Sequence, residues 1–179
     1  FGAGTPGNDG DGVFLDTAPS NRIGGEGDPT RNVISANLGV GVRVAGGSAS
    51  GNLIAGNFIG LTADGNAALG NASEGVLIEG SATGNTIGGG NVLSANLRGI
   101  TLAPTTSRNV IVGNRIGSNA DGEGDLGNAK EGVLIDGSPN NQVIGNGEGS
   151  QILSGNNVGL RIVGATASGN VVSGNFIGT

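Results

Sequence analysis

The pattern Gly75-Val-Leu-Ile78 decides the fold, because the same Gly-apolar-x-apolar pattern occurs six times in this chain of 179 residues. The opening glycines are Gly12, Gly41, Gly75, Gly99, Gly132 and Gly159, so successive copies lie 29, 34, 24, 33 and 27 residues apart. A motif that returns at such a period is typical of a solenoid, in which each repeat buries its apolar face against its neighbours.

Two further apolar pieces follow each opening glycine. They are short, rich in β-branched residues and bounded by Gly, Asn and Ser, which is the pattern of short β-strands. The second pieces are Asn21-Arg-Ile23, Asn52-Leu-Ile54, Asn85-Thr-Ile87, Asn109-Val-Ile111, Asn141-Gln-Val143 and Asn170-Val-Val172. The third pieces are Asn32-Val-Ile34, Asn57-Phe-Ile59, Asn91-Val-Leu93, Asn114-Arg-Ile116, Gln151-Ile-Leu153 and Asn175-Phe-Ile177. Because side chains alternate along a strand, we expect the aliphatic residue that ends each of these pieces to point inward.

Three short strands per turn, repeated six times, predict an all-β coil with three faces. Equivalent strands would stack in parallel, about 4.8 Å apart. Long inserts occur only in alternate coils, at residues 61–73 and 118–130. We therefore predict a single domain over residues 1–179, built from three two-coil repeats at about 11–73, 74–130 and 131–179, without separate caps.

Asparagine recurs at the corners of this predicted coil. It opens all six second pieces (Asn21, Asn52, Asn85, Asn109, Asn141 and Asn170) and five third pieces (Asn32, Asn57, Asn91, Asn114 and Asn175). A third set stands three or four residues before the opening glycines: Asn8, Asn37, Asn71, Asn96, Asn128 and Asn156. The amide carries both a donor and an acceptor, so we expect stacked asparagines to hydrogen-bond along the rod.

A row of apolar residues is predicted to face outward. Alternation places Phe14, Leu77 and Leu134 on the outside of the first face, and Val33, Phe58, Val92, Ile152 and Phe176 on the outside of the third. Two interpretations stay open. The long inserts could fold back over this row through Ala67, Ala68 and Leu69, or the row could pack laterally against another rod.

Composition restricts the function. The chain has no Cys or His, two aromatic residues in a hundred and a formal charge of −6. Nucleic acid is a poor partner for such a surface, because phosphate binding needs clustered cations and base stacking needs aromatic rings. No apolar run approaches the roughly 18 residues of a membrane-spanning helix.

No residues are assigned a catalytic or cofactor-binding role. Acidic residues do recur beside the first strands, at Asp11, Glu74 and Glu131 and at Asp16, Glu79 and Asp136. A carboxylate pair could cleave a glycoside, but a catalytic site is normally one irregular place in a regular scaffold, and these pairs are copied three times.

Calcium is the only cofactor that the sequence suggests. The segments Asn119-Ala-Asp-Gly-Glu-Gly-Asp125 and Gly7-Asn-Asp-Gly-Asp-Gly12 offer alternating oxygen ligands, but neither has the twelve-residue loop of a calcium-binding hand. We favour the alternative that both are polar turns, where Asp and Gly are preferred for backbone reasons.

The chain resembles the right-handed parallel β-helix superfamily, also called the pectate-lyase-like fold. It is closest in pattern to long bacterial secreted or surface proteins built from Gly-Asn-x-Ile-x-Gly-Asn-x-Ile-Gly units, as in Gly51-Asn-Leu-Ile-Ala-Gly-Asn-Phe-Ile-Gly60 and Gly169-Asn-Val-Val-Ser-Gly-Asn-Phe-Ile-Gly178. The resemblance implies a β-helix of about six coils, and it is weak for function because the scaffold carries lyases, hydrolases, adhesins and inert spacers. Polygalacturonase-like members of the superfamily would show paired aspartates and Gly-His-Gly, which this chain lacks.

The leading hypothesis is a non-catalytic structural protein, a segment of a bacterial extracellular rod, filament or surface stalk. The chain starts at Phe1, and its first and last residues join nearly in phase with the repeat, so we expect a mature product or part of a longer polypeptide. The expected partner is a second copy, stacked head to tail or packed laterally. An adhesin or polysaccharide-binding module is the alternative, and a polysaccharide lyase or hydrolase is the third.

Overall fold

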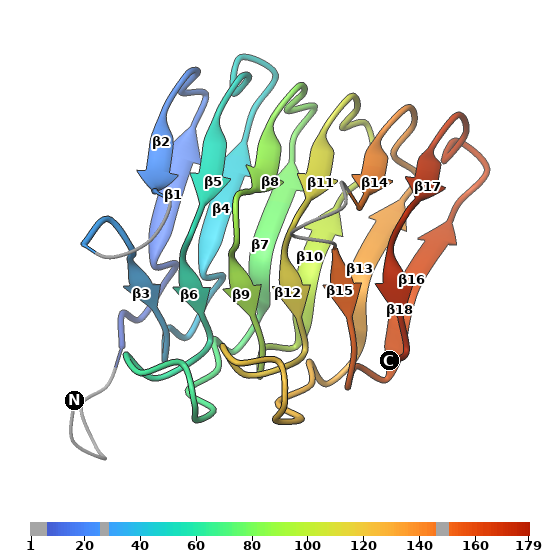
Figure 1. Cartoon of the computed structure of the whole chain (residues 1–179). Coiled ribbons are helices and arrows are strands. Elements are labelled where there is room, and N and C mark those ends of the chain that lie inside the picture. Colours follow the sequence, from blue (N-terminus) through green and yellow to red (C-terminus); the bar gives the residue numbers. More distant parts are fainter. Residues whose placement is uncertain (1–6, 26–28, 146–150) are drawn as a thin grey trace.

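The computed structural model describes residues 7–25, 29–145 and 151–179. The segment at residues 1–6, which resembles the end of a long insert in sequence, lies outside the described residues. In the described residues, eighteen strands wind into six coils of three strands each, and the coils advance along one rod axis from blue to red (Figure 1). No helix is present in the described ranges, so none there could cross a membrane.

Equivalent strands of successive coils form three parallel six-stranded sheets. The first sheet contains β1 (Val13–Asp16), β4 (Val42–Ala45), β7 (Glu74–Glu79), β10 (Arg98–Leu102), β13 (Glu131–Asp136) and β16 (Val158–Val163). The second contains β2 (Arg22–Gly24), β5 (Leu53–Ala55), β8 (Thr86–Gly88), β11 (Val110–Val112), β14 (Gln142–Ile144) and β17 (Val171–Ser173). The third contains β3 (Val33–Ile34), β6 (Phe58–Ile59), β9 (Val92–Leu93), β12 (Arg115–Ile116), β15 (Ile152–Leu153) and β18 (Phe176–Ile177).

The register stacks each inward aliphatic on its counterpart in the next coil. In the first sheet Val76 pairs with Ile100, which pairs with Val133, and in the second Ile87 pairs with Ile111. The residues of this core are fully or almost fully buried through the middle coils. The predicted all-β fold of about six three-stranded coils is therefore confirmed.

The last coil has the same inward residues but no coil beyond it in the structure. Ile177 is 48% exposed, whereas Leu153, its partner one coil below, is 0% exposed. Ile162 and Val172 are exposed for the same reason. Stacking between coils therefore supplies a large part of the burial of these aliphatics.

The corners between strands require unusual backbone angles. Gly56 and Gly113, at the tight corners between second and third strands, have φ of 66° and 63°, a region that L-residues with a side chain seldom adopt. Gly60 lies so close to the next coil that a Cβ atom would meet the Ser94 carbonyl oxygen at 2.0 Å. The glycine content of the chain is thus explained by corners and by close contact between coils.

Candidate functional site

Three asparagine ladders run along the rod, one at each set of corners. In each ladder the Nδ2 of one residue donates to the side-chain oxygen of its counterpart in the next coil. The Asn37 to Asn71 bond is the shortest at 2.7 Å and the Asn96 to Asn128 bond the longest at 3.3 Å. In most steps the backbone N–H donates to the same oxygen, as from Asn85 to Asn109 at 2.9 Å.

In the interior coils, the ladder bonds occupy the donor and acceptor groups of the asparagine side chains. Asn85 and Asn109 are 0% exposed, and the Nδ2 of Asn85 also donates to the Ala49 carbonyl at 2.9 Å. A buried amide with every group bonded holds the coils in register and is not free to bind a ligand. Ten of the eleven asparagines expected at the second and third corners bond to a ladder neighbour, and the exception is Asn175, whose Nδ2 donates to backbone carbonyls.

One ladder is interrupted near the last coil. Gln151 takes the place of an asparagine and accepts from Asn114 through Oε1, from the backbone N at 2.8 Å and from Nδ2 at 3.1 Å. The Nε2 of Gln151 and the Oδ1 of Asn175 are both buried without a hydrogen bond in the described part of the chain. The longer glutamine side chain therefore preserves the step from Asn114 but does not form the next step, from Gln151 to Asn175.

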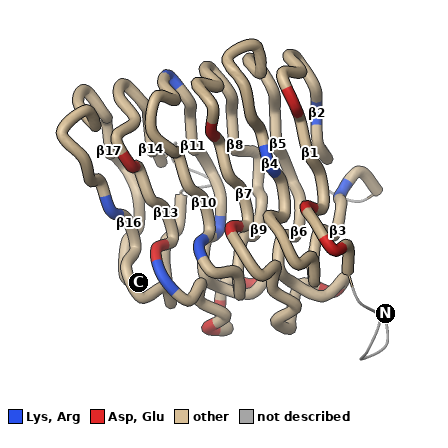
Figure 2. Tube along the Cα trace, turned by 180° about the vertical axis from the view of Figure 1, so that it is seen from behind, with Lys and Arg blue, Asp and Glu red and all other residues tan. Residues whose placement is uncertain are grey.

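The recurring carboxylates of the first sheet are paired with arginine. Arg98 lies between Glu74 and Glu131, with its Nη1 3.0 Å from Glu74 Oε1 and its Nε 2.7 Å from Glu131 Oε2. The second oxygen of Glu131 contacts Arg161 at 3.2 Å, and that of Glu74 accepts from the Ser73 hydroxyl at 2.5 Å. Figure 2 shows the acidic and basic residues interleaved over these strands. Sequence reasoning missed this pairing, although Arg98 directly precedes an opening glycine, as both glutamates do.

Glu131 does not have the protonation properties of a general acid. Burial alone raises the pKa of Glu131, but hydrogen bonds from Arg98, from the backbone and from Arg161 outweigh it and lower the pKa below its ordinary value. A general acid at neutral pH needs a raised pKa. With both oxygens of each glutamate bonded, the arrangement stabilises neighbouring coils.

The apolar row is divided between exposed and covered residues. Phe14 and Phe176 are about half exposed, at 51% and 52%, and Leu77, Leu134 and Ile152 are partly buried. Phe58 and Val92 are only 5% and 3% exposed, so these two residues are covered and are not open to the lateral packing that was one of the two interpretations.

The long inserts cover these two residues, but not through the residues expected. Ala67 and Ala68 are exposed and Leu69 is partly buried. A second apolar cluster instead joins Phe58 and Val92 to Leu61, Ala120 and Leu126, and the guanidinium of Arg31 lies 4.0 Å from the Phe58 ring centroid. Val33, at 39% exposed, keeps its predicted position.

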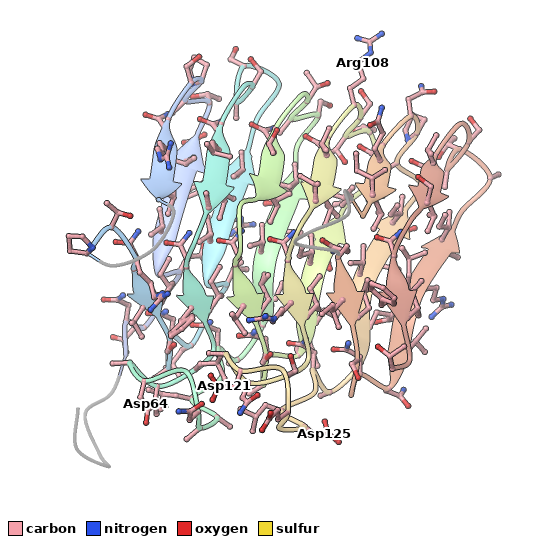
Figure 3. All side chains as sticks on the ribbon, in the orientation of Figure 1. Asp64, Arg108, Asp121 and Asp125 are labelled. Atoms are coloured by element: carbon pink, nitrogen blue, oxygen red, sulfur yellow. The ribbon has the colours of Figure 1, made fainter. Side chains whose placement is uncertain are left out.

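The acidic insert has the structure of a polar turn. The Oδ1 of Asn119 accepts from the backbone N–H of Glu123 at 3.0 Å and of Gly124 at 2.9 Å. Asp64, Asp121 and Asp125 lie on the two inserts at the lower edge of Figure 3. In the described ranges no three acidic side chains gather as metal ligands, and calcium titration is the test of the calcium hypothesis.

A polar hollow lies between the second insert and the last coil. It has a volume of about 330 Å³ and is lined by Ser118, Glu123, Asp125 and Ser154 together with glycine backbone and Thr179. Its lining contains no paired acid and base, because its two acidic residues, Glu123 and Asp125, are both exposed and neither has an arginine partner in the described structure.

Comparison with known proteins supports the fold. Residues 60–147, just under half of the chain, match the model of the family described as periplasmic copper-binding protein (NosD). No curated protein shows detectable sequence similarity to the chain.

Three crystal structures of variants of a periplasmic alginate epimerase, AlgG, are similar in fold. Two have a TM-score of 0.65 at 15% and 16% identity, over 94% and 93% of this chain, and the third has 0.63 at 17% identity over 92%. The chain spans only 36% of the length of each epimerase structure.

The copper ligands that proteins prefer are imidazole, thiolate and thioether groups. This chain contains no His, Cys or Met, so its residues do not fit a copper site of that kind. The similarity therefore establishes the architecture: the chain folds as a right-handed parallel β-helix that resembles the NosD family through its middle coils.

Proposed function

We propose that this chain is a non-catalytic structural segment of a bacterial envelope or extracellular protein, a rod whose coils continue end to end. One observation carries the proposal. In the described coils, the ladder asparagines and the two glutamates Glu74 and Glu131 are bonded to side chains of neighbouring coils, so their polar groups are engaged between repeats. Asn109 and Glu131 exemplify this, since each has its side-chain acceptors occupied by a neighbouring coil.

The proposed location rests on the similar proteins. Both the NosD family and the alginate epimerase are described as periplasmic. The absence of cysteine is compatible with such an oxidising location, because no thiol is available for unwanted disulfides.

A polysaccharide-binding or polysaccharide-modifying role is the second candidate. The similarity in fold to an alginate epimerase over most of this chain favours it. Asn and Asp side chains could bond sugar hydroxyls, although Trp and Tyr, which stack on sugar rings, are absent from the chain.

A screen of the purified protein on alginate, polygalacturonate and a glycan array separates the two candidates. The structural role predicts no turnover and no saturable binding. Turnover that is lost in Glu74→Gln or Glu131→Gln, while a Glu123→Gln control on the exposed insert keeps it, would contradict the structural role and assign the reaction to the first sheet.

A further inference from the structure

The two long inserts contain the same turn. Each has the tripeptide Ala-Asp-Gly, at residues 63–65 and 120–122. In both inserts the glycine N–H donates to the carbonyl three residues earlier, at 2.9 Å for Gly65 and at 3.1 Å for Gly122. Both glycines have a positive φ, of 73° and 84°. The inserts therefore place one tripeptide and one type of turn in two different surroundings.

An Asp-Gly sequence can rearrange its own backbone. The glycine nitrogen attacks Cγ of the aspartate, the N–Cγ bond forms, and the N–H proton leaves with a hydroxyl of the protonated carboxyl as water. A water molecule then adds to the main-chain carbonyl carbon of the five-membered imide, and the original peptide C–N bond breaks. The product is isoaspartate, in which the chain runs through the side chain and is longer by one methylene. Glycine favours this reaction because it has no side chain to shield its nitrogen.

The surroundings of the first insert restrain this reaction. The Oδ1 of Asp64 accepts from the Thr62 hydroxyl at 2.5 Å and from the Asn66 N–H at 3.2 Å. These bonds, with that of Thr62 the stronger, lower the pKa of Asp64, so its reactive protonated form is rarer. Gly65 is buried, and its carbonyl accepts from the Ala120 N–H at 3.0 Å. Both reacting groups are thus held in place.

The aspartate of the second insert has no such restraint. Asp121 and Gly122 are both exposed, and the Asp121 carboxylate makes no hydrogen bond or ion pair with a described residue. Asn119 occupies the position that a threonine holds in the first insert, and its Oδ1 accepts from two backbone N–H groups further along the turn. The Asp121 carboxyl is therefore free to rotate toward the glycine nitrogen.

We propose that Asp121-Gly122 is a site of spontaneous isoaspartate formation in the folded protein, and that the surroundings of Asp64-Gly65 protect the same tripeptide there. Both aspartates lie at the lower edge of Figure 3. The inference is independent of whether the rod is structural or binds a polysaccharide. Asp9-Gly10 is exposed as well, but it lies close to residues 1–6, which are outside the described ranges, so the comparison uses the inserts alone.

The rearrangement would alter the cover over the second apolar cluster. Ala120, which directly precedes the reacting aspartate, packs against that cluster and joins the two inserts through its N–H bond to Gly65. An additional methylene would displace the turn that the Asn119 N–H closes by donating to the Gly124 carbonyl at 2.9 Å. Modification should therefore loosen the contact between the inserts, and faster exchange of the Ala120 N–H would report this change.

Peptide mapping of the 179-residue chain after incubation for weeks at neutral pH tests the proposal. Mass spectrometry with electron-transfer fragmentation distinguishes isoaspartate from aspartate in each peptide. Isoaspartate at Asp121 should exceed that at Asp64 by about tenfold, because each hydrogen bond that must break before attack slows the reaction. The chain unfolded in urea is the control, incubated until both tripeptides show product, and there they should react at similar rates.

Two variants separate the effect of the surroundings from that of the sequence. Thr62→Ala removes one partner of the Asp64 carboxylate, so isoaspartate at Asp64 should rise several-fold while that at Asp121 stays unchanged. Asp121→Glu keeps the charge but would need a six-membered imide, so no product should form at this position. The exchange of the Ala120 N–H should then increase with age in the unchanged protein and stay constant in Asp121→Glu.

Equal amounts of isoaspartate at the two positions of the folded chain would overturn the proposal. The absence of isoaspartate at Asp121 in the folded chain, when the unfolded chain forms it at both positions, would do the same. If the folded Thr62→Ala variant showed no increase at Asp64, the assigned cause of protection would be wrong.

Discussion

Substitution of Asn109 by alanine measures how much a single ladder step stabilises the fold. Asn109 is 0% exposed, and its Oδ1 accepts from the backbone N–H of Asn85 at 2.9 Å and from the Nδ2 of Asn85 at 3.2 Å. After the change the Nδ2 of Asn85 keeps its bond to the Ala49 carbonyl, but the backbone N–H of Asn85 loses its only acceptor.

The magnitude follows from these bonds. Leaving one buried donor without a partner costs about 1–3 kcal/mol, and the lost bond from Asn109 to Asn141 costs about 1 kcal/mol. We therefore expect Asn109→Ala to lower the free energy of unfolding by about 2–4 kcal/mol. Asn66→Ala is the matched control, since Asn66 is exposed on the first insert and should change stability by less than about 0.5 kcal/mol.

Urea unfolding followed by circular dichroism provides the measurement, with the two variants compared at the same protein concentration. Asn109→Asp adds a second test. Its new oxygen would face the acceptor of Asn141, so the variant should be less stable than Asn109→Ala near neutral pH and should recover in acid, when the carboxyl becomes a donor. A loss from Asn109→Ala no larger than that from Asn66→Ala would refute the idea that the ladders hold the coils together.

Three further predictions use the interrupted ladder, the covered apolar row and the charge row. Gln151→Asn should raise the free energy of unfolding by about 1–2 kcal/mol, because it gives partners to two buried polar atoms; an unchanged urea midpoint would count against the broken step. Phe58→Ala should cost about 3 kcal/mol and Phe176→Ala less than about 1 kcal/mol, since only the first ring is buried; thermal unfolding that shows equal losses would argue against coverage by the inserts. Folding lowers the pKa of Glu131, so the stabilisation by its ionised form is fully present above the ordinary pKa of 4.5 and is lost as the pH falls through the lower pKa of the folded protein. The variant Glu131→Gln should therefore show a smaller fall in melting temperature over this acidic range. A pH profile of melting temperature equal to that of the unchanged protein would contradict a stabilising contact between Glu131 and Arg98.

The architecture could be predicted from the sequence because each coil repeats one local rule. An aliphatic such as Ile111 ends an Asn-x-Ile piece, and its counterparts Ile87 and Val143 stack on it in register. The positions of the ladder asparagines could be predicted for the same reason, because a parallel solenoid places equivalent residues of successive coils directly above one another.

The features that could not be predicted depend on contacts between segments without a shared pattern. The cover over Phe58 comes partly from Ala120 and Leu126, in an insert two coils further along the chain. The pairing of Arg98 with Glu131 had a signal in the sequence, because both residues directly precede an opening glycine, but which nitrogen meets which carboxylate oxygen depends on side-chain reach. The long inserts obey no period, so their contacts become apparent only in three dimensions.

Amide hydrogen exchange of the asparagine backbone N–H groups tests the central claim most directly. In the structure the N–H groups of Asn85 and Asn109 donate to side-chain oxygens of the next coil rather than to a strand. If stacked amides bind the coils into one rod, these two N–H groups exchange as slowly as that of Ile111 in the neighbouring strand. Exchange at the rate of an exposed turn amide, such as that of Asn66, would contradict the account.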